Sequence, residues 1–209
     1  MSKPLEIWLI RHGETAWSLT GQHSGRYDLP LTPHGEEEAR ATALALQGVV
    51  FDKVICSPLQ RATRTCELTG YLAQARIEPD AAEWDYGDCT SFTQDQLAEK
   101  YPGWTIWRGP VPNGESIEQI SARARRVIEG IKAEGGRVAV FAHGHFLRIF
   151  TTQYLGLEPE RGRHFALATA AICILGAEQG EPAIVAWNRK GAESRAGAAT
   201  TAGLKPRAR

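Results

Sequence analysis

Two apolar segments of the chain end in the same way, in a histidine followed by a glycine. Residues 5–10 lead into Arg11-His12-Gly13, and residues 138–142 lead into His143-Gly144. Both runs have the length and the apolar character of buried strands. Because ligands bind at the carboxyl ends of strands in an open α/β sheet, we expect the two histidines to meet at one edge of such a sheet.

The residues of the first turn suit a phosphate group. Arg11 offers a planar fork of donors that matches phosphate oxygens, and a helix N-terminus after a strand favours anions. Gly13 is expected to let the backbone approach the ligand closely. Beside a phosphate, a neutral imidazole such as that of His12 can act as a nucleophile. Each residue alone also fits an ordinary polar strand end, so the argument depends on partners elsewhere in the chain.

A second arginine is expected near the same edge. Residues 54–56 have the pattern of a short strand, and residues 57–60 form a capping box that predicts a helix to about residue 75. Arg61 lies in the first turns of that helix, close to the strand end. Two arginines are what a dianionic phosphate needs, although Arg61 alone also fits an exposed helix position.

The remaining segments predict one α/β domain over residues 1–189, in which helical and extended patterns alternate. Residues 17–26 are expected to form a polar loop. The expected helices are residues 36–47 behind Thr32, one behind the Thr93 capping box, one behind the Ser116 capping box, and residues 146–155. The expected edge strands are residues 77–79 and an antiparallel pair at 171–175 and 183–187. Residues 190–209 lack apolar periodicity and are predicted to be disordered.

Composition argues against several classes of protein. The 209 residues carry 24 basic and 24 acidic side chains, and a net charge of zero speaks against a nucleic-acid-binding surface. The sequence shows no signal-peptide core, and no apolar run is long enough to span a bilayer. The four cysteines have no CxxC spacing, and Cys56 and Cys173 lie in apolar runs, which suits reduced thiols. We therefore expect a cytoplasmic protein without a nucleic-acid or membrane partner.

With these motifs in order, the chain resembles the histidine phosphatase superfamily, whose archetype is cofactor-dependent phosphoglycerate mutase. The corresponding segments are Arg-His-Gly-Glu-Thr at 11–15, Ser-Pro-Leu-x-Arg-Ala at 57–62, the loop around Glu83, and His143-Gly144. The match extends over residues 5–188. The resemblance implies a three-layer α/β/α sandwich with a mostly parallel sheet, and it implies a phosphoric monoester hydrolase.

The resemblance also implies a phosphohistidine intermediate. His12 would attack phosphorus, while Arg11, Arg61 and His143 would hold the phosphoryl oxygens. Glu83 would protonate the leaving oxygen. Phosphoryl transfer needs positioning and charge stabilisation, which two arginines supply without a metal ion. No cofactor is implied, and we expect the arginines to favour the neutral form of His12.

Within the superfamily the chain is similar to sugar-phosphate phosphatases of the sedoheptulose-1,7-bisphosphatase type. This likeness implies a small phosphorylated substrate, a ketose bisphosphate among the candidates. The residues that it places against the substrate are His23, Ser24, Tyr86, Gly144 and Arg148. The chain departs from the pattern at His23, which stands in place of a tyrosine, and at residues 89–91, which replace an aromatic-acidic-glycine turn.

Two alternatives keep the phosphate site but change its use. A phosphoglycerate mutase would hold a substrate carboxylate with a lysine and an adjacent arginine pair after the glutamate loop. The chain offers only Lys100 and Arg108 there, and Arg125-Arg126 lies inside the predicted long helix. A non-catalytic phosphate-binding relative would ordinarily have lost one of the five catalytic positions, and none is lost here. Hydrolysis is therefore the preferred hypothesis, with the oligomeric state undetermined.

A metal-dependent hydrolase is the third alternative. His143 and His145 could combine with Asp85 and Asp88 as ligands. A third histidine at ligand spacing is missing, and the paired arginines would repel a cation. His145 is therefore assigned only a capping or pocket-lining position, without a role in the chemistry.

Overall fold

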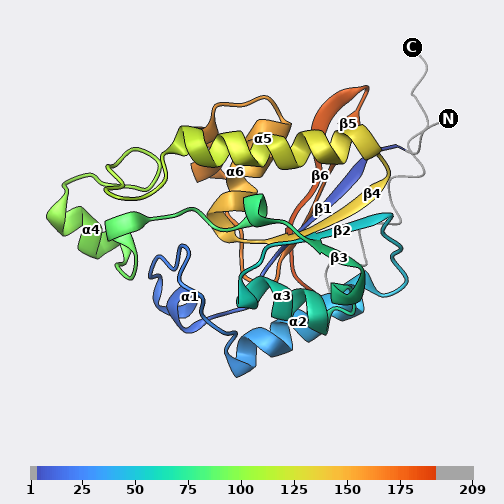
Figure 1. Ribbon diagram of the computed structural model, residues 1–209, viewed down its shortest axis with the longest axis horizontal. Helices are drawn as coiled ribbons and strands as arrows, with labels where there is room; N and C mark the ends of the chain where they lie inside the picture. Colours follow the sequence, from blue (N-terminus) through green and yellow to red (C-terminus); the bar gives the residue numbers. More distant parts are fainter. Residues whose placement is uncertain (1–3, 192–209) are drawn as a thin grey trace, which may run out of the picture.

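The computed structural model describes residues 4–191. In this part of the chain six strands form one sheet between two layers of helices (Figure 1). The strands are β1 (Glu6–Arg11), β2 (Lys53–Cys56), β3 (Ala75–Ile77), β4 (Arg137–Ala142), β5 (Ile172–Glu178) and β6 (Glu181–Arg189). The α-helices are α1 (Ala16–Thr20), α2 (Pro33–Leu46), α3 (Gln60–Leu68), α4 (Gln94–Lys100), α5 (Ile117–Glu134) and α6 (Gly144–Tyr154). The short 3-10 helices are η1 (Leu72–Gln74), η2 (Pro79–Ala81), η3 (Gly87–Cys89) and η4 (Pro159–His164).

The sheet is mixed, and its parallel part is the larger one. Its strand order is β3-β2-β4-β1-β5-β6. Strands β3, β2, β4 and β1 pair in parallel, whereas β5 pairs antiparallel with both β1 and β6. The predictions of an α/β fold with a mostly parallel sheet and of an antiparallel pair at one edge are confirmed.

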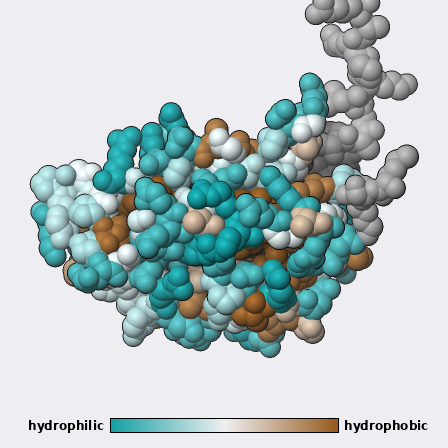
Figure 2. Space-filling view, turned by 45° about the horizontal axis from the view of Figure 1, so that its top comes forward, coloured by the Kyte–Doolittle hydropathy of each residue, from teal (hydrophilic) through white to brown (hydrophobic). Residues whose placement is uncertain are grey.

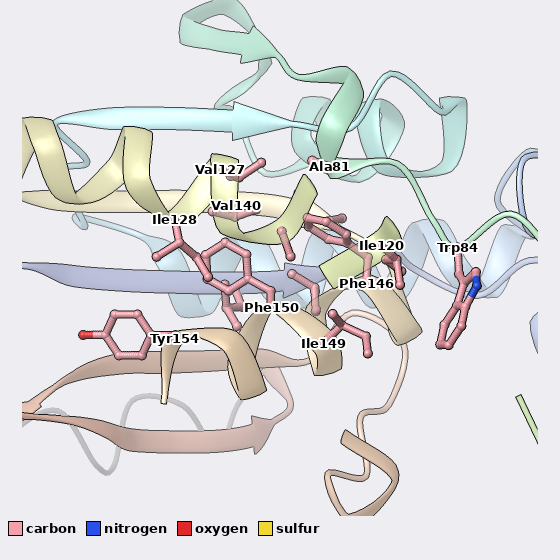
Figure 3. Packing of buried hydrophobic residues seen from close by; sticks show 14 of the residues in the cluster. Ala81, Trp84, Ile120, Val127, Ile128, Val140, Phe146, Ile149, Phe150 and Tyr154 are labelled. Carbon is pink, nitrogen blue, oxygen red and sulfur yellow. The ribbon is translucent and has the colours of Figure 1, made fainter. Parts of the chain in front are cut away.

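The central strands are buried on both faces, because helices cover both sides of the sheet. Ile7 and Leu9 join a core cluster with side chains of α5 and α6, while Trp8 and Ile10 face a second cluster that includes residues of α2 and α3. This alternation along β1 is the two-residue repeat of a strand. Figure 3 shows the α5–α6 side, where Phe146 lies among apolar side chains of both helices.

The register of the central pair places the two histidine-glycine turns side by side. Arg11 at the end of β1 stands opposite Ala142 at the end of β4, and the His12 N–H donates to the Ala142 carbonyl at 3.0 Å. The ring centroids of His12 and His143 are 5.2 Å apart. The expectation that the two histidines meet at one sheet edge is confirmed.

Several predicted element boundaries are wrong. Helix α3 begins at Gln60 behind Leu59, so residues 57–60 do not cap it, because the Ser57 hydroxyl contacts His143 instead. The helix ends at Leu68 rather than near residue 75, and Gly70 follows in a left-handed conformation. The predicted polar loop over residues 17–26 contains the short helix α1, which the Thr15 side chain caps. The small edge strand occupies Ala75–Ile77 rather than 77–79.

Figure 2 shows one face of the molecule, on which hydrophilic residues cover most of the surface and apolar residues lie in scattered groups. No helix within residues 4–191 is long and apolar enough to cross a membrane. Of the tail predicted to be disordered, residues 192–209 lie outside the described residues. Lys190, at the start of that predicted tail, forms an ion pair of 3.1 Å with Glu38 of α2.

Gly13 is required by packing between two backbones, a contact that the sequence analysis did not predict, and its approach to a ligand stays a prediction. A Cβ on Gly13 would lie 2.2 Å from the carbonyl oxygen of Gly35, and a Cβ on Gly35 would lie 2.1 Å from that of Glu14. The turn after β1 therefore crosses the first turn of α2 at a distance that only two glycines permit. This crossing holds the segment that carries His12.

We expect Gly35→Ala to lower the free energy of unfolding by about 1–3 kcal/mol, because the added methyl group meets backbone that cannot rotate away. The measurement is urea denaturation followed by circular dichroism. Gly130→Ala is the matched control, since a Cβ there meets nothing within 4 Å inside helix α5. That change should stabilise the protein by up to about 1 kcal/mol. Equal unfolding midpoints for Gly35→Ala and the wild-type chain would refute the argument.

Candidate active site

Five side chains named from the sequence come together at the carboxyl ends of β1, β2 and β4. His12 and Arg11 end β1, Arg61 lies in the first turn of α3, and His143 is the N-cap of α6. Glu83 comes from the loop after η2 and binds the start of α6. Arg61 and His143 are fully buried, and His12 and Glu83 are only 4% and 6% exposed.

The hydrogen bonds of His12 determine which ring nitrogen carries the proton. Its Nδ1 lies 2.7 Å from the carbonyl oxygen of Gly13, which can only accept a hydrogen bond. Nδ1 therefore carries the hydrogen in the neutral ring. The lone pair of Nε2 is left available for a ligand.

His143 is held by a chain of hydrogen bonds that also fixes its tautomer. Arg61 Nε donates to His143 Nδ1 at 3.1 Å, so the hydrogen of the neutral ring is on Nε2. That Nε2 lies 2.7 Å from the hydroxyl oxygen of Ser57 and donates to it. The two terminal nitrogens of Arg61 donate to the carbonyls of Tyr27 and Gly25, at 2.9 and 2.8 Å. Arg61 thus connects α3, α6 and the loop before Pro30.

Arg11 keeps a buried donor free of protein partners. Its Nη1 donates to the Leu167 carbonyl, whereas its Nε is buried and has no hydrogen-bond partner. Among the buried side-chain nitrogen and oxygen atoms of residues 4–191, Nε of Arg11 is the only one without a partner. A buried donor without a partner is unfavourable, so an oxyanion that accepts from Nε would relieve it. Gly144 lies next to this guanidinium, since a Cβ there would be in van der Waals contact with Arg11 Cζ at 3.4 Å.

Burial and the two arginines keep both histidines neutral. The pKa of His12 lies well below its ordinary value of 6.5, first because burial disfavours the charged ring and then because Arg61 and Arg11 repel a further positive charge. Burial and Arg61 likewise hold the pKa of His143 well below 6.5. Burial also lowers the pKa of Arg11 and of Arg61. The site therefore combines neutral imidazoles with concentrated positive charge, which suits an anionic ligand.

Glu83 lies at the positive end of α6. Its Oε1 accepts from the backbone N–H groups of Trp84 and Phe146, at 2.9 and 2.8 Å, and its Oε2 accepts from that of His145 at 3.1 Å. Three amide donors and a helix N-terminus stabilise a carboxylate in this position. The carboxyl group is thereby held in one orientation at the start of α6, where its charge acts on Arg11 and Arg61.

The hydrolase family of this chain follows from comparison with known proteins. Residues 7–190 match the family described as the histidine phosphatase superfamily (branch 1). The chain belongs to the histidine phosphatase superfamily.

Two phosphatases illustrate how close the relatives of this histidine phosphatase are. It is 38% identical over 178 residues to an acid phosphatase of Mycobacterium tuberculosis, and the aligned part covers 83% of this chain and 87% of that protein. It is 34% identical over 181 residues to the sedoheptulose 1,7-bisphosphatase of Saccharomyces cerevisiae, and the aligned part covers 71% of this chain and 67% of that enzyme. The prediction of a phosphoric monoester hydrolase is confirmed.

The fold agrees with this assignment. The solved structure of an open reading frame product from Mycobacterium tuberculosis superposes with a TM-score of 0.85 at 34% sequence identity. The superposition covers 90% of this chain and 98% of that one. The family and the three-layer fold expected from the sequence are therefore both confirmed.

The predicted substrate-contact residues of the phosphatase lie in two places. His23 and Tyr86 pack edge to face with ring centroids 4.9 Å apart, and Tyr86 lies within 2.6 Å of His145 Nδ1. Ser24 is half-buried in the loop that Arg61 binds, and Tyr27 donates to its carbonyl at 2.9 Å. Arg148 lies further along α6, with its guanidinium 4.6 Å from the ring centroid of Trp107. The contact of these residues with a substrate stays a prediction.

His145 is more closely involved than the sequence suggested. Burial holds its pKa well below 6.5, its ring stacks at 6.0 Å on that of His23, and its backbone N–H binds Glu83. In the sequence, the only indication that His145 belongs to the site was its position two residues after His143, at the start of a helix. That signal is weak, because it does not say which way the side chain points.

A metal ion held by His143, His145, Asp85 and Asp88 does not fit the contacts of these residues. Both ring nitrogens of His143 are engaged, and Nδ1 of His145 is bonded to Tyr86. The Asp85 and Asp88 carboxylates accept from Gly87 and Asn113. Within residues 4–191 no group of three or more His, Cys, Asp or Glu side chains is placed to hold a metal ion.

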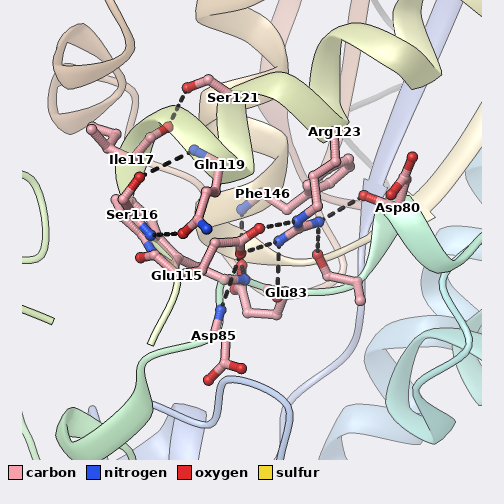
Figure 4. A network of polar contacts seen from close by, with 12 residues as sticks. Asp80, Glu83, Asp85, Glu115, Ser116, Ile117, Gln119, Ser121, Arg123 and Phe146 are labelled. Atoms are coloured by element: carbon pink, nitrogen blue, oxygen red, sulfur yellow. Dashed lines mark hydrogen bonds and ion pairs between the residues drawn. The ribbon is translucent and has the colours of Figure 1, made fainter. Parts of the chain in front are cut away.

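A buried ion pair that the sequence analysis missed anchors the loop carrying Glu83 (Figure 4). Arg123 of α5 donates to both carboxylate oxygens of Glu115, at 2.6 and 2.8 Å. The same guanidinium donates to the carbonyls of Asp80, Ala82 and Glu83. One arginine thus satisfies three backbone carbonyls within four residues of the loop. Helical periodicity places Arg123 on α5 but says nothing about the loop it meets.

We expect Arg123→Met to lower the free energy of unfolding by about 3–5 kcal/mol, because it leaves the Glu115 carboxylate and three carbonyls without their donor. Phosphate release should fall with it, since the Glu83 loop loses its anchor. Urea denaturation and initial-rate assays test both effects. Arg125→Met is the matched control on the same helix, where Arg125 is exposed and bonds only to Gln153. If the two variants unfold alike, the anchoring argument fails.

Stability should fall as the pH is lowered from about 7.5 to about 5.5. Below 6.5 the unfolded chain protonates His12 and His143, whereas the folded chain, with lower pKa values, does not. The unfolded state then binds more protons, so each buried histidine contributes a slope of up to about 1.4 kcal/mol per pH unit. Urea denaturation across this range measures the slope. His12→Gln should reduce it and the exposed control His34→Gln should not, and an unchanged slope in His12→Gln would refute the assignment.

Proposed function

We propose that the chain is a metal-independent phosphatase that hydrolyses small sugar phosphates through a phosphohistidine on His12. One observation carries the proposal: Nδ1 of His12 is committed to the Gly13 carbonyl, which leaves the Nε2 lone pair free. The neutral ring lies beside Arg11 and Arg61, neither of which has a carboxylate partner within the described residues. A neutral nucleophile among unpaired guanidinium groups suits attack on a phosphate dianion. The same positive charge disfavours a metal cation.

In the proposed first step, His12 Nε2 bonds to phosphorus as the bond from phosphorus to the sugar oxygen breaks. Arg11 and Arg61 stabilise the charge on the phosphoryl oxygens, and His143 reaches one of them by exchanging its bond with Ser57. Glu83 transfers a proton to the leaving oxygen, so the sugar departs as an alcohol.

In the second step, the Glu83 carboxylate takes a proton from water while the water oxygen bonds to phosphorus. The bond from phosphorus to Nε2 breaks, inorganic phosphate is released, and His12 returns to its neutral state. The amide donors of Trp84, His145 and Phe146 support this step, because they hold the Glu83 carboxyl group in one orientation.

A small sugar phosphate, a ketose bisphosphate among the candidates, is the proposed substrate class. Support comes from the relative named as sedoheptulose 1,7-bisphosphatase and from the wall of polar aromatic groups formed by His23, Tyr86 and His145. A phosphoglycerate mutase is disfavoured because Arg125 and Arg126 are exposed on α5, where Arg126 binds Asp80. With Arg125 bonded to Gln153 and Arg126 to Asp80, these side chains do not supply the arginine pair that a mutase needs.

The test is phosphate release in excess EDTA from a panel of sugar monophosphates and bisphosphates, together with 3-phosphoglycerate. We expect fast release from a ketose bisphosphate and loss of at least about 1,000-fold in kcat for His12→Ala, because removing a nucleophile removes the covalent route. His34→Ala, an exposed histidine on α2, is the matched control. Quenched wild-type reactions should contain an acid-labile, alkali-stable phosphoenzyme.

Two results would overturn the proposal. Absence of release from every compound, with EDTA or with added divalent metals, would rule out hydrolysis of this class of substrate. Full activity of His12→Ala would leave hydrolysis standing but remove His12 as the nucleophile.

A further inference from the structure

The Glu38 carboxylate of α2 contacts both segments of the chain that hold His12 and Arg11. Its Oε2 accepts from the backbone N–H of Glu14 at 2.9 Å, two residues after His12. Its Oε1 accepts from the Thr169 hydroxyl at 2.9 Å, in the segment that binds Arg11. We propose that Glu38 is a positioning residue, which aligns His12 and Arg11 toward one phosphoryl group. The inference rests on the proposed function for the roles of these two residues toward phosphate.

The segment of residues 167–171, which leads into β5, binds both Arg11 and His12 directly. The Leu167 carbonyl accepts from Nη1 of Arg11. The Ala170 N–H donates to the His12 carbonyl at 3.0 Å. A shift of this segment would therefore displace the Arg11 guanidinium, whose buried Nε is left for a phosphoryl oxygen.

Helix α2 holds residues 167–171 through two side chains that lie one turn apart. Glu38 accepts from this segment, and Thr42, four residues later and buried, donates to the Ala170 carbonyl at 2.7 Å. These two hydrogen bonds tie the segment to a regular helix of 14 residues. Glu38 also binds the turn after His12. Because one planar carboxylate accepts from both, it fixes the turn and the segment relative to each other.

Glu38 is a carboxylate at neutral pH, although its side chain is only 11% exposed. Burial acts to raise its pKa, but hydrogen bonds from Thr169, Lys190 and the Glu14 backbone outweigh that effect and hold the pKa below the ordinary 4.5. An anion with two oxygens can accept from both segments at once. Burial lowers the pKa of Arg11, and the charge of Glu38 is among those that act to raise it.

Steady-state hydrolysis of p-nitrophenyl phosphate by the full chain tests the inference with Glu38→Leu and Glu38→Gln. We expect Glu38→Leu to lower kcat by at least about 30-fold and to change KM by less than about 3-fold, because alignment matters most in the transition state. Glu38→Gln should restore kcat to within about 5-fold of the wild type, since its amide can accept from Glu14 and donate to the Thr169 hydroxyl oxygen. Glu37→Leu, at an exposed position of the same helix, is the matched control and should leave both constants unchanged.

Thr169→Val removes the same hydrogen bond from the other side and tests the inference if Glu38→Leu does not fold. Thr169 is half-buried and loses only its hydroxyl in this variant. We expect kcat to fall by about 5-fold, because the Glu14 contact of Glu38 is kept. Combined with Glu38→Leu, the change should cause no further loss, since both remove one bond. Lys190→Met removes the exposed ion-pair partner of Glu38 and should leave kcat within about 2-fold of the wild type.

Anion binding measured by calorimetry separates this inference from the proposed function. Vanadate takes a fifth ligand, as phosphorus does in the proposed transfer, so its affinity depends on the alignment of His12 with Arg11. The affinity of inorganic phosphate depends mainly on charge. For Glu38→Leu we expect the Kd of vanadate to rise by at least about 10-fold and that of phosphate by less than about 2-fold.

A merely structural role of Glu38 would lower the free energy of unfolding but leave the ratio of the two Kd values unchanged. An unchanged ratio in folded Glu38→Leu, or a kcat equal to that of Glu37→Leu, would therefore refute the inference while hydrolysis stands. If the wild-type chain binds vanadate but hydrolyses no phosphate ester, the proposed function fails. The shift of the Kd ratio then still decides whether Glu38 aligns the anion site.

Discussion

The structure depends on the parallel, in-register pairing of β1 with β4. Arg11 stands opposite Ala142, so both strands end at the same level and the next residue of each is a histidine. Helices cover both faces of this pair, and the alternating apolar side chains of β1 are divided between two core clusters. A shift of register by one residue would turn these side chains to the wrong faces and separate His12 from His143. The core that stabilises the fold therefore also aligns the site.

Concentrated positive charge is the second constraint. Arg61 is fully buried, and its donors go to backbone carbonyls and a neutral histidine rather than to a carboxylate. Such an arrangement stabilises the empty protein less than an apolar core would, because the charge is desolvated without a counter-ion. A phosphate ester supplies the missing charge. The buried Nε of Arg11 follows the same principle, because it has no hydrogen-bond acceptor within the described residues.

The contacts that the sequence analysis missed share one physical cause, which is that the partner of a residue can lie far away along the chain. Ser57 has the spacing of a helix cap, but its hydroxyl accepts from His143, which lies 86 residues further along the chain. Gly13 has the freedom that a ligand-binding turn needs, but it is required by the backbone of Gly35. His145 and Arg123 fit local patterns, and only the packing of α5 and α6 against the Glu83 loop shows what they bind. Local patterns carry no information about such partners.

The sequence by itself determined the α/β class, the strand ends that carry His12 and His143, the family and the five residues of the candidate site. The α/β class and the strand ends depend on apolar runs, which are local, whereas the family and the five site residues, Glu83 among them, come from the motifs that the chain shares with a known family. Only the tertiary structure decided the tautomers of the two histidines, the three amide donors of Glu83, the Arg123 anchor and the contacts of Glu38. These depend on contacts between segments far apart in the sequence, where geometry and desolvation select the partners.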